Sequence, residues 1–411
     1  FNGRAKRPAE PPANSARPEG SPYPSDNTAP VDELFQRIEN ALAERTQKNL
    51  RRSLRLTHHE NGALNLADND YLDLARNPVV NAAAAAAISE HGTSASASPL
   101  ITGWRGPHAR LLERLCAWHE FPFGMLWTSG YAANSAVLSL LPVRGDLVLA
   151  DRLIHNSMIA GLLRSGARLQ RYEHLQLDQL EELLAQTRSG RSVFVVTESV
   201  FSMDGDYPNL ARMAELKRRH GFYWIVDEAH ALGWFGPEGA GLVRATNVAE
   251  AVDVLVGTLG KTLASGGAYT LFRNEAVRDY LINTAGEFIY STAFPPANAV
   301  AATAAIERVR ELATQQPKWQ ARSREFRAQL RRENWAAPDG DSPIVPVRLD
   351  DAEAAVSLAE ALRRENILTA AVRPPTVPQG TSRLRFSLKR TFDEVAASRV
   401  LSIMARWRGA R

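Results

Sequence analysis

Short apolar runs alternate with amphipathic stretches through the middle of the chain. The runs are rich in Val, Ile and Leu, a composition typical of buried strands. They lie at 125–127, 147–150, 193–197, 223–226, 252–256 and 269–272. Strands that alternate with helices in this way usually form a mostly parallel sheet. The pattern therefore predicts a large α/β domain over residues 76–310.

Beyond residue 310 the spacing of apolar positions changes. A charged helix, two further helices and two strands are expected there. The helices are expected at 319–334, at 351–365 and at the C-terminus, and the strands at 344–349 and 384–387. This order predicts a smaller α+β domain over residues 311–411.

The first 30 residues are rich in Pro, Ser, Gly and Asn and show almost no apolar periodicity. We expect residues 1–30 to form a flexible tail. Because the chain does not begin with Met, we also expect a processed or truncated start. Asp32 is placed to cap a helix through Leu34 and Leu42. Residues 31–75 are interpreted as an N-terminal arm.

Composition narrows the class of protein. The 411 residues are 45% hydrophobic and 23% charged, which excludes a wholly disordered or fibrous chain. The net charge of +4 does not indicate a nucleic-acid partner, and no apolar run is long enough to span a membrane. A single cysteine, Cys116, excludes an internal disulfide and cysteine-based metal clusters. We therefore expect a cytoplasmic protein without a metal site.

Polar residues follow two neighbouring predicted strands. One strand is followed by Asp227 and His230, and the next by a Gly-Thr-Leu-Gly-Lys-Thr segment that contains Lys261. Ligands of open α/β sheets bind where the strands end, so these side chains are expected to meet. A lysine among small and hydroxyl residues suits an aldehyde cofactor that carries a phosphate. Gly257 and Gly260 have the wrong spacing for a nucleotide-phosphate loop.

The segments VDEAHALGWFG (226–236) and GTLGKT (257–262) resemble the fold type I pyridoxal-phosphate enzymes, and more narrowly the α-oxoamine synthases. Further blocks similar to this family follow one another between residues 38 and 400. They are NDYLDLA (69–75), TGWRGPH (102–108), TSGYAAN (128–134), DRLIHNS (151–157), TESVFSMDGD (197–206), IYSTAFPPA (289–297) and RPPTVPQGTSRLR (373–385). The resemblance implies a fold type I transferase. Its large domain would hold a mostly parallel, seven-stranded type of sheet, and its C-terminal domain would be a smaller α+β unit.

The same resemblance implies pyridoxal 5′-phosphate as the cofactor and assigns residues to it. Lys261 would bind the cofactor aldehyde covalently and then act as the base on the substrate. Asp227 would keep the pyridine nitrogen protonated, since a nearby anion favours the cation. His155 would stack on the ring, and His230 would hydrogen-bond its phenolate oxygen.

The cofactor phosphate needs backbone N–H groups and hydroxyls. Gly130, Tyr131 and Thr258 are expected to supply them. Ser291 and Thr292 would reach in from a second subunit, as the family's dimeric site implies. The alternative for Tyr131 is a plain core position.

Substrate contacts follow from the same matches. Ser202 is expected to line the cofactor and Glu198 the substrate, although a buried glutamate after a strand can also be purely structural. Arg385 would clamp the amino-acid carboxylate as a planar, bidentate donor, with Asn69 beside it. The neighbouring Arg383 is expected to face the other side of its strand.

Three further residues are candidates for the substrate. Arg51, or its neighbour Arg52, would meet the far carboxylate of the acyl substrate or the phosphates of its carrier; the alternative is a solvated pair of charges. His108 matches a substrate histidine of the family. Either His108 or His155 would assist proton transfer.

The chain also departs from the family pattern. Asp73 and Ser199 stand where glycine is usual, and LKRTF (388–392) lacks a histidine that often follows the arginine strand. The segment GTSASASPLITG (92–103) has Ser, Ala and Pro in place of glycines or an arginine. Side chains added where backbone approaches a ligand reshape a cavity, so these departures leave the identity of the substrate undecided.

The resemblance implies a decarboxylative condensation of an amino acid with an acyl thioester to give an α-amino ketone. The motifs are most similar to the branch that joins L-alanine to pimeloyl-CoA, or to its carrier-protein equivalent, in biotin synthesis. A different acyl chain, or glycine or serine, is the alternative within the family, and an aminotransferase is the alternative outside it. A homodimer with shared active sites is expected.

Overall fold

The computed structural model describes residues 29–56, 62–187, 190–349 and 351–410. Most of the predicted tail, residues 1–28, lies outside these ranges. The chain divides into two compact units, one up to Arg55 and one from Leu56 to Arg411. Each unit is described by itself.

The first unit contains the helix α1 (Ala29–Gln47). It begins three residues before Asp32, so Asp32 lies within the first turn and not at the cap position that the sequence predicts. Pro30 suits the start of a helix, because its fixed φ matches the helix and its missing N–H has no partner there in any case.

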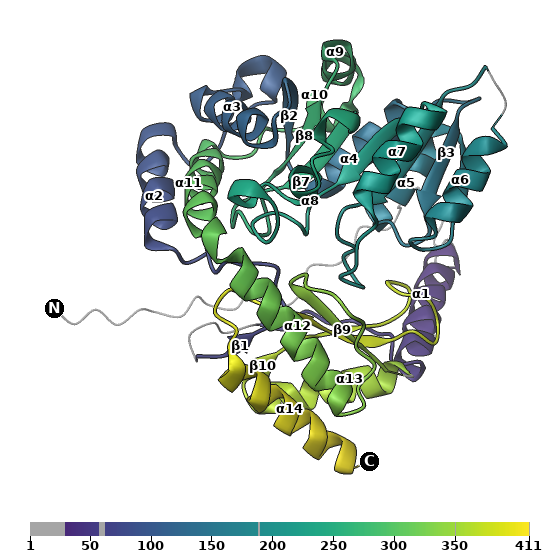
Figure 1. The fold of residues 1–411 in the computed structure, drawn as a ribbon, viewed down its shortest axis with the longest axis vertical. Coiled ribbons are helices and arrows are strands. Elements are labelled where there is room, and N and C mark those ends of the chain that lie inside the picture. Colours follow the sequence, from purple (N-terminus) through teal and green to yellow (C-terminus); the bar gives the residue numbers. More distant parts are fainter. Residues whose placement is uncertain (1–28, 57–61, 188–189, 350, 411) are drawn as a thin grey trace, which may run out of the picture. The chain divides into compact units, whose positions relative to one another are not determined.

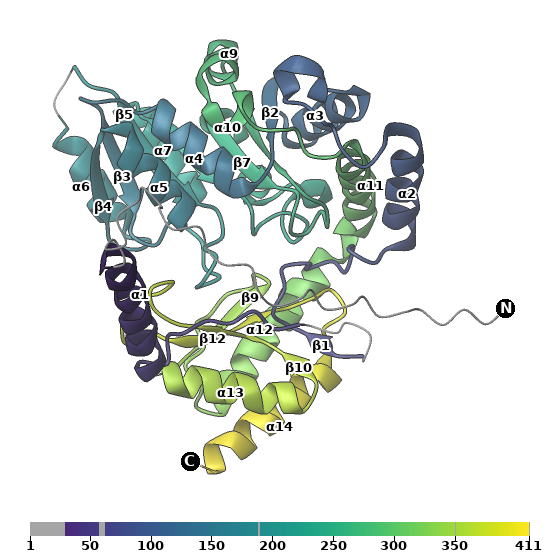
Figure 2. The same cartoon turned by 180° about the vertical axis from the view of Figure 1, so that it is seen from behind.

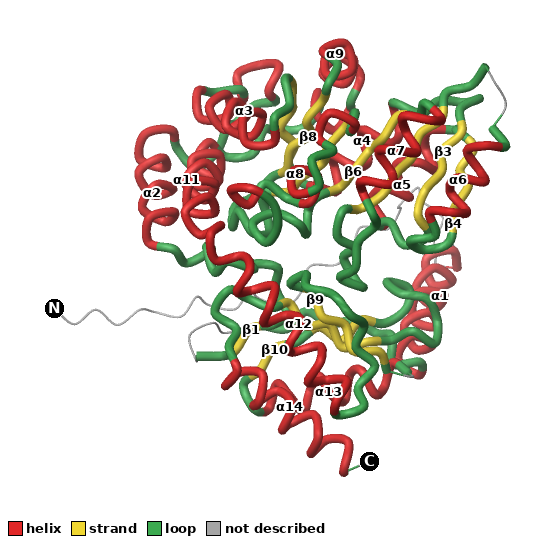
Figure 3. Tube along the Cα trace, in the orientation of Figure 1, coloured by secondary structure: helices red, strands yellow, loops and turns green. Residues whose placement is uncertain are grey.

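The second unit contains the predicted mostly parallel sheet. Within its described residues, seven strands pair in the order β2-β8-β7-β6-β5-β3-β4. All neighbours are parallel except around β8, which runs antiparallel to β2 and β7. Figure 3 shows the strands of the sheet in yellow among the helices in red. The strands are β2 (Phe123–Trp127), β3 (Leu147–Asp151), β4 (Arg168–Tyr172), β5 (Val193–Glu198), β6 (Tyr223–Asp227), β7 (Val254–Thr258) and β8 (Ala268–Phe272).

Helices cover both faces of this sheet because alternate strand residues point to opposite faces. In β6, Trp224 and Val226 belong to one apolar core and Ile225 to the other. The first core includes side chains of α3 (Gly106–His119), α6 (Leu177–Ala185), α7 (Leu210–His220) and α11 (Pro296–Leu312). The second includes side chains of α4 (Gly130–Leu140), α5 (Asn156–Ser165), α9 (Glu275–Thr284) and α10 (Gly286–Ile289). Figures 1 and 2 show these two layers from opposite sides.

Shorter elements complete the large domain. The helix α2 (Pro78–His91) packs on α11, and α8 (Leu242–Ala245) follows β6. The segment Pro99–Gly103 forms a π-helical turn before α3. None of the helices in the described part of the chain is long and apolar enough to cross a membrane.

The C-terminal part forms a smaller α+β domain, as predicted. Its antiparallel sheet has the order β11-β12-β9. The elements are α12 (Gln316–Arg332), β9 (Ile344–Arg348), α13 (Ala352–Arg364), β10 (Ile367–Leu368), β11 (Ala370–Val372), β12 (Arg383–Ser387) and α14 (Glu394–Gly409). The short strand β1 (Leu64–Asn65) pairs in parallel with β10. Residues 64–65, which the sequence places in the arm, are therefore joined to this domain.

One strand of the large sheet and one expected boundary differ from the sequence prediction. The strand β4 is not predicted, because its sequence RLQRY is largely polar; it lies at the edge of the sheet and pairs with β3 alone. The predicted domain boundary at residue 310 falls inside α11, which continues to Leu312. A polar edge strand lacks the apolar run that predicts a strand, and the helix at residue 310 has no Gly or Pro beside it to mark an end.

The loop of residues 199–207, here called the connecting loop, is tied to the large domain by His174. His174 Nδ1 lies 2.9 Å from Asp151 Oδ1, and Nε2 lies 3.1 Å from Asp206 Oδ2. Burial opposes the charged imidazolium, but these two carboxylates outweigh it and raise the pKa of His174 to about 10. A cation thus joins the end of β3 to the connecting loop.

The same loop is bonded to the small domain. Ser342 Oγ donates to the Gly205 carbonyl, and Tyr207 OH donates to Asp341 Oδ1 at 2.9 Å. Gly205 has φ +68°, and a Cβ there would lie 2.1 Å from the Ile344 carbonyl oxygen. Only glycine therefore allows this close approach. The connecting loop bridges the two domains.

We predict that His174→Gln lowers the free energy of unfolding by about 1–2 kcal/mol near pH 6, between values typical of exposed and buried ion pairs. The pKa of His174 in the folded protein, about 10, lies above the ordinary 6.5. The stabilisation is therefore fully present below pH 6.5 and is lost as the pH rises toward 10. Urea denaturation near pH 6 and near pH 10 measures the difference.

His91→Gln is the matched control. The His91 side chain is equally exposed, at 21%, but its one ion-pair partner is the exposed Glu90, 3.5 Å away. Its replacement is expected to change stability little at either pH. A loss of stability in His174→Gln that is equal at both pH values would contradict the imidazolium bridge.

Candidate active site

The carboxyl ends of β5, β6 and β7 bring the central polar groups together. Glu198 ends β5 and Asp227 ends β6, and the two are direct partners in the parallel register. Residues in register on parallel strands point to the same face, so both carboxyl groups lie on one side of the sheet. Both are buried, with 2% and 7% of their surfaces exposed. Lys261 follows β7, three residues beyond Thr258.

A chain of hydrogen bonds runs from Lys261 through His230. Lys261 Nζ lies 2.7 Å from His230 Nε2, and His230 Nδ1 lies 2.6 Å from Tyr71 OH. Tyr71 OH donates to Asn69 Oδ1 at 3.1 Å. We assign His230 as a neutral ring, in which one nitrogen donates and the other accepts, so that it joins the Lys261 amine to the Tyr71 hydroxyl.

The charges at the site agree with this assignment. Burial, together with the cations Lys261 and Arg385, holds the pKa of His230 well below its ordinary value. Burial lowers the pKa of Lys261 to about 8, although Asp227 and Glu198 act in the opposite direction. Burial and the charge of Asp227 raise the pKa of Glu198 well above its ordinary value. Burial therefore disfavours the ionised form of Glu198, and the Lys261 amine has a pKa of about 8.

Asp227 is oriented by two donors. Asn134 Nδ2 of α4 donates to Oδ2 and the Ala229 N–H donates to Oδ1, each at 2.8 Å. Asn134 also donates to Ser157 Oγ at 3.1 Å, and that hydroxyl lies 2.7 Å from His155 Nδ1. His155 is exposed and caps α5 through the Ser157 N–H. His155 is therefore an exposed side chain that lies close enough to Asp227 to feel its charge.

Arg385 lies on the small-domain side of the same group. Its Nε donates to the Ser202 carbonyl at 2.7 Å, Nη1 to Ser387 Oγ at 2.8 Å and Nη2 to Asn69 Oδ1 at 3.0 Å. The residue is only 3% exposed, and these acceptors are all neutral. A buried guanidinium bonded only to neutral oxygens is suited to bind a carboxylate from a ligand.

The expected orientation of Arg383 is wrong. Its guanidinium binds Asp204 and the Met203 carbonyl, next to the Ser202 carbonyl that Arg385 binds. Strand residues alternate between faces, so residues two apart, such as Arg383 and Arg385, share a face. Both arginines hold the connecting loop, but Arg383 is neutralised by an aspartate and Arg385 is not.

The predicted phosphate ligands lie at the start of α4 and the end of β7. Ser129 Oγ caps α4 by accepting from the Ala132 N–H, so Gly130 and Tyr131 form the first turn, where N–H groups lack helical partners. Tyr131 is 52% exposed, which excludes the core alternative. Thr258 Oγ1 accepts from the Gly260 N–H at 3.2 Å.

Ser291 and Thr292 lie on a surface loop before α11. Thr292 is exposed and Ser291 partly so, and both line a small hollow with Trp127 and Thr128. Within the described residues no hydrogen bond or ion pair joins them to the group around Lys261. Their role in a neighbouring subunit stays a prediction.

Two other predicted substrate residues are not joined to this group. His108 accepts from the Arg105 N–H at Nδ1 and contacts the Phe294 carbonyl at Nε2, 2.9 Å away. Both ring nitrogens are therefore occupied by backbone, which favours a structural role over proton transfer. Arg51 belongs to the first compact unit and is exposed, so its role stays a prediction.

The donor set fits the cofactor that the resemblance implies. Glu198 Oε1 and Asn134 Oδ1 are buried and have no hydrogen-bond partner in the described part of the chain. Buried polar atoms are rarely left this way, so a ligand with polar edges suits the space beside Asp227. Lys261 matches the aldehyde of pyridoxal phosphate. The exposed side chain of His155 matches its ring, and the first turn of α4 matches its phosphate.

Sequence reasoning missed three residues of the site. Tyr71, Asn134 and Ser157 each lie inside a block that was matched to the family, yet none was assigned a role. Each is a polar residue that is packed beside a predicted catalytic residue in the folded chain. That packing depends on tertiary contacts and is invisible in the sequence alone.

Comparison with known proteins shows the family. Residues 61–399 match the family described as aminotransferase class I and II. The 8-amino-7-oxononanoate synthase of Trichlorobacter lovleyi is 41% identical over 362 residues, covering 87% of this chain and 92% of that protein. The 8-amino-7-oxononanoate synthase of Anaeromyxobacter dehalogenans is 42% identical, covering 83% of this chain and 85% of that protein.

Solved structures agree in fold. Serine palmitoyltransferase of Sphingomonas wittichii is 25% identical with a TM-score of 0.84, covering 94% of this chain and 99% of that one. 8-Amino-7-oxononanoate synthase of Francisella tularensis is 27% identical with a TM-score of 0.74, covering 85% of this chain and 99% of that one. The chain therefore belongs to the aminotransferase class I and II family of fold type I pyridoxal-phosphate enzymes, and within it to the α-oxoamine synthases.

Proposed function

We propose that this chain binds pyridoxal 5′-phosphate through Lys261 and condenses L-alanine with a pimeloyl thioester. The observation that carries the proposal is the contact of the Lys261 amine with a neutral His230, beside the buried carboxylate of Asp227. When bound, the cofactor withdraws electrons from the amino acid and makes its α-proton acidic. The protein's own side chains must then orient the reactants and carry the protons.

Four residues are assigned to the cofactor ring. Asp227, fixed by two donors, holds a proton on the pyridine nitrogen. The exposed ring of His155 covers one face, and a ring N–H of His230 donates to the phenolate oxygen. Ser202, held between Glu198 and Arg385, lines the ring from the connecting loop.

The phosphate is assigned to the backbone of Gly130 and Tyr131 and to the Thr258 hydroxyl. Ser291 and Thr292 of a second copy complete this site in a homodimer. The exposure of both segments supports the assignment, because a second subunit can then reach the phosphate.

Lys261 is the proposed base. Its pKa of about 8 leaves part of the amine unprotonated at neutral pH, so it can take the α-proton of the amino acid. The neutral Nε2 of His230 holds the amine without neutralising it. Burial and the charge of Asp227 raise the pKa of Glu198, which disfavours a second negative charge beside Asp227.

Arg385 and Asn69 are assigned to the amino-acid carboxylate. The likeness to proteins named 8-amino-7-oxononanoate synthase supports alanine and a pimeloyl group on coenzyme A or a carrier protein, in biotin synthesis in the cytoplasm. The products are 8-amino-7-oxononanoate, carbon dioxide and the free thiol. Glycine, serine or another acyl chain remain the alternatives to test.

We predict that Lys261→Ala abolishes the visible absorption of lysine-bound pyridoxal phosphate and the release of carbon dioxide. The measurement is the absorption spectrum of the protein after addition of the cofactor. Lys217→Ala, which removes a lysine paired with Asp253 instead, should keep the wild-type spectrum. A Lys261→Ala protein that retains the visible band would refute the assignment.

Arg385→Lys is expected to raise the KM for the amino acid about tenfold or more, because an ammonium cannot replace two parallel guanidinium bonds to a carboxylate. The KM for the thioester should change little. Arg383→Lys is the control on the same strand, since Arg383 is paired with Asp204. Equal effects of the two substitutions on the amino-acid KM would argue against Arg385 as the clamp.

A panel of substrates separates the candidate reactions. Carbon dioxide release from L-alanine should require an acyl thioester and be fastest with pimeloyl-CoA or a pimeloyl carrier protein. A ketone formed only from a long-chain acyl-CoA, or from glycine or serine, would favour another α-oxoamine synthase. A keto acid formed without any thioester would instead indicate an aminotransferase.

A further inference from the structure

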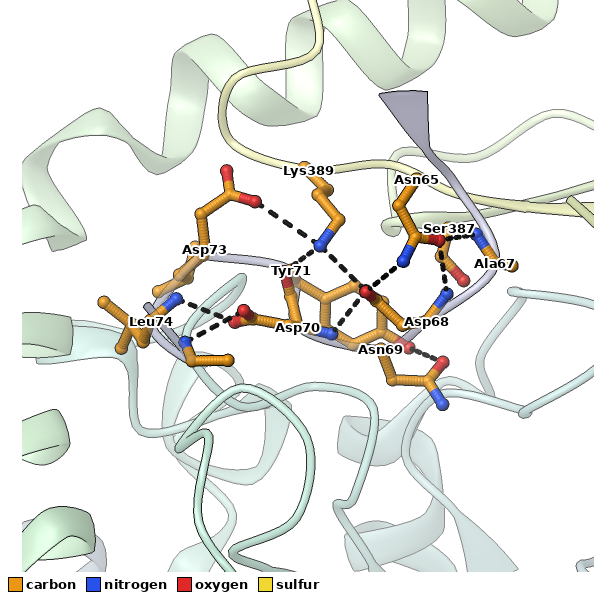
Figure 4. A network of polar contacts seen from close by, with 12 residues as sticks. Asn65, Ala67, Asp68, Asn69, Asp70, Tyr71, Asp73, Leu74, Ser387 and Lys389 are labelled. Carbon is orange, nitrogen blue, oxygen red and sulfur yellow. Dashed lines mark hydrogen bonds and ion pairs between the residues drawn. The ribbon is translucent and has the colours of Figure 1, made fainter. Parts of the chain in front are cut away.

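The segment of residues 65–74 carries two site residues on a backbone that has little regular structure. Beyond the end of β1 at Asn65 it consists of turns and bends. Asn69 nevertheless contacts Arg385, and Tyr71 contacts His230. Figure 4 shows the polar contacts that hold this segment. Bonds within the segment, such as Asn65 Nδ2 to Asp68 Oδ2 at 2.7 Å and the Leu74 N–H to Asp70 Oδ1 at 2.8 Å, shape its turns, and contacts from the C-terminal domain add to them.

Lys389, just beyond β12, reaches into the segment. Its Nζ lies 2.8 Å from Asp68 Oδ1, 3.4 Å from Asp73 Oδ1 and 3.2 Å from the Asp70 carbonyl oxygen. The Lys389 side chain is 11% exposed, whereas those of Asp68 and Asp73 are 40% and 29% exposed. A nearly buried ammonium thus binds acids on both sides of Asn69 and Tyr71.

Asp73 adopts a backbone conformation that is unusual for its residue type. Its φ of 53° lies in the left-handed region, which favours glycine. Its carboxylate receives both Lys389 and the hydroxyl of Thr391, which donates to Oδ2 at 2.8 Å. Two side chains of the C-terminal segment, Lys389 and Thr391, therefore bind the carboxylate of Asp73 at this strained turn.

Backbone bonds run along the same two segments. The Ser387 N–H donates to the Leu66 carbonyl and the Arg390 N–H to the Tyr71 carbonyl, each at 2.8 Å. The Arg390 side chain adds a bond from Nε to the Leu72 carbonyl at 2.8 Å. Lys389 is the group that connects its first and last acids.

We propose that Lys389 is a positioning residue for the amino-acid substrate: by binding Asp68 and Asp73 it holds Asn69 against Arg385 and Tyr71 against His230. The proposal rests on the proposed function, since it assigns the carboxylate of the amino acid to Arg385 and Asn69. Lys389 touches neither reactant. Its effect passes through the segment that it holds.

Lys389→Met tests the proposal, because methionine keeps most of the length and loses the charge. We expect the dissociation constant of the amino acid to rise about fivefold to tenfold, the range that corresponds to the loss of one ordinary hydrogen bond at the carboxylate. The KM for the thioester should stay within about twofold. Lys389→Arg should recover most of the binding, since it keeps the charge. Absorption titration of the cofactor-loaded enzyme with L-alanine gives the constant.

Two comparisons exclude a merely structural effect. Lys217→Met removes another half-buried lysine, 20% exposed and paired with Asp253, and should leave amino-acid binding unchanged. Combining Lys389→Met with Asp68→Asn should weaken binding no further than Lys389→Met alone, because both changes break one pair. Additive losses, or equal losses for the amino acid and the thioester, would overturn the proposal.

Hydrogen exchange supplies a measurement that needs no catalysis. Without substrate, the amides of residues 66–74 should exchange faster in Lys389→Met than in the wild type, and those of β5 should not. Unchanged exchange in this segment would also overturn the proposal. If the wild type fails to bind any amino acid, the proposed function fails, and the exchange result still decides whether Lys389 holds the segment.

Discussion

The parallel alignment of β5 and β6 determines which charges meet at the site. Their register sets Glu198 beside Asp227 on the same face, where two anions cannot both be tolerated without solvent. Burial and the charge of Asp227 raise the pKa of Glu198 well above its ordinary value, whereas the Asp227 carboxyl group accepts from two hydrogen-bond donors. Burial at the same site lowers the pKa of Lys261 to about 8, so its amine can lose a proton.

Much of this arrangement could be predicted from the sequence. The fold followed from apolar runs that alternate with helices, and Asp227, His230 and Lys261 followed from their places directly after strands. Local sequence is sufficient there because a parallel sheet brings all strand ends to one edge. Family motifs added Arg385 and Asn69, and the structure joins these two by a hydrogen bond.

The partners of His174 and Asp73 depended on tertiary contacts, and the face on which Arg383 lies depended on a correct use of strand geometry. Nothing in the sequence near His174 indicates that Asp151 and Asp206 will approach it from elements far apart in the chain. From the sequence, Arg383 and Arg385 are expected on opposite faces of their strand. Strand residues two apart share a face, so that expectation is wrong. Asp73 was noted as a departure from glycine, but its lysine and threonine partners come from the other end of the chain.

The connecting loop has a consequence for how this enzyme can change. Ser202 lies on a loop whose next residues are bonded to the small domain by Arg383, Ser342 and Asp341. Substitutions at those distant positions would move Ser202 without touching a ligand. Variants selected for a new amino acid or acyl chain therefore have two routes: direct changes at the residues around Lys261, and remote changes in the C-terminal domain that tilt the loop.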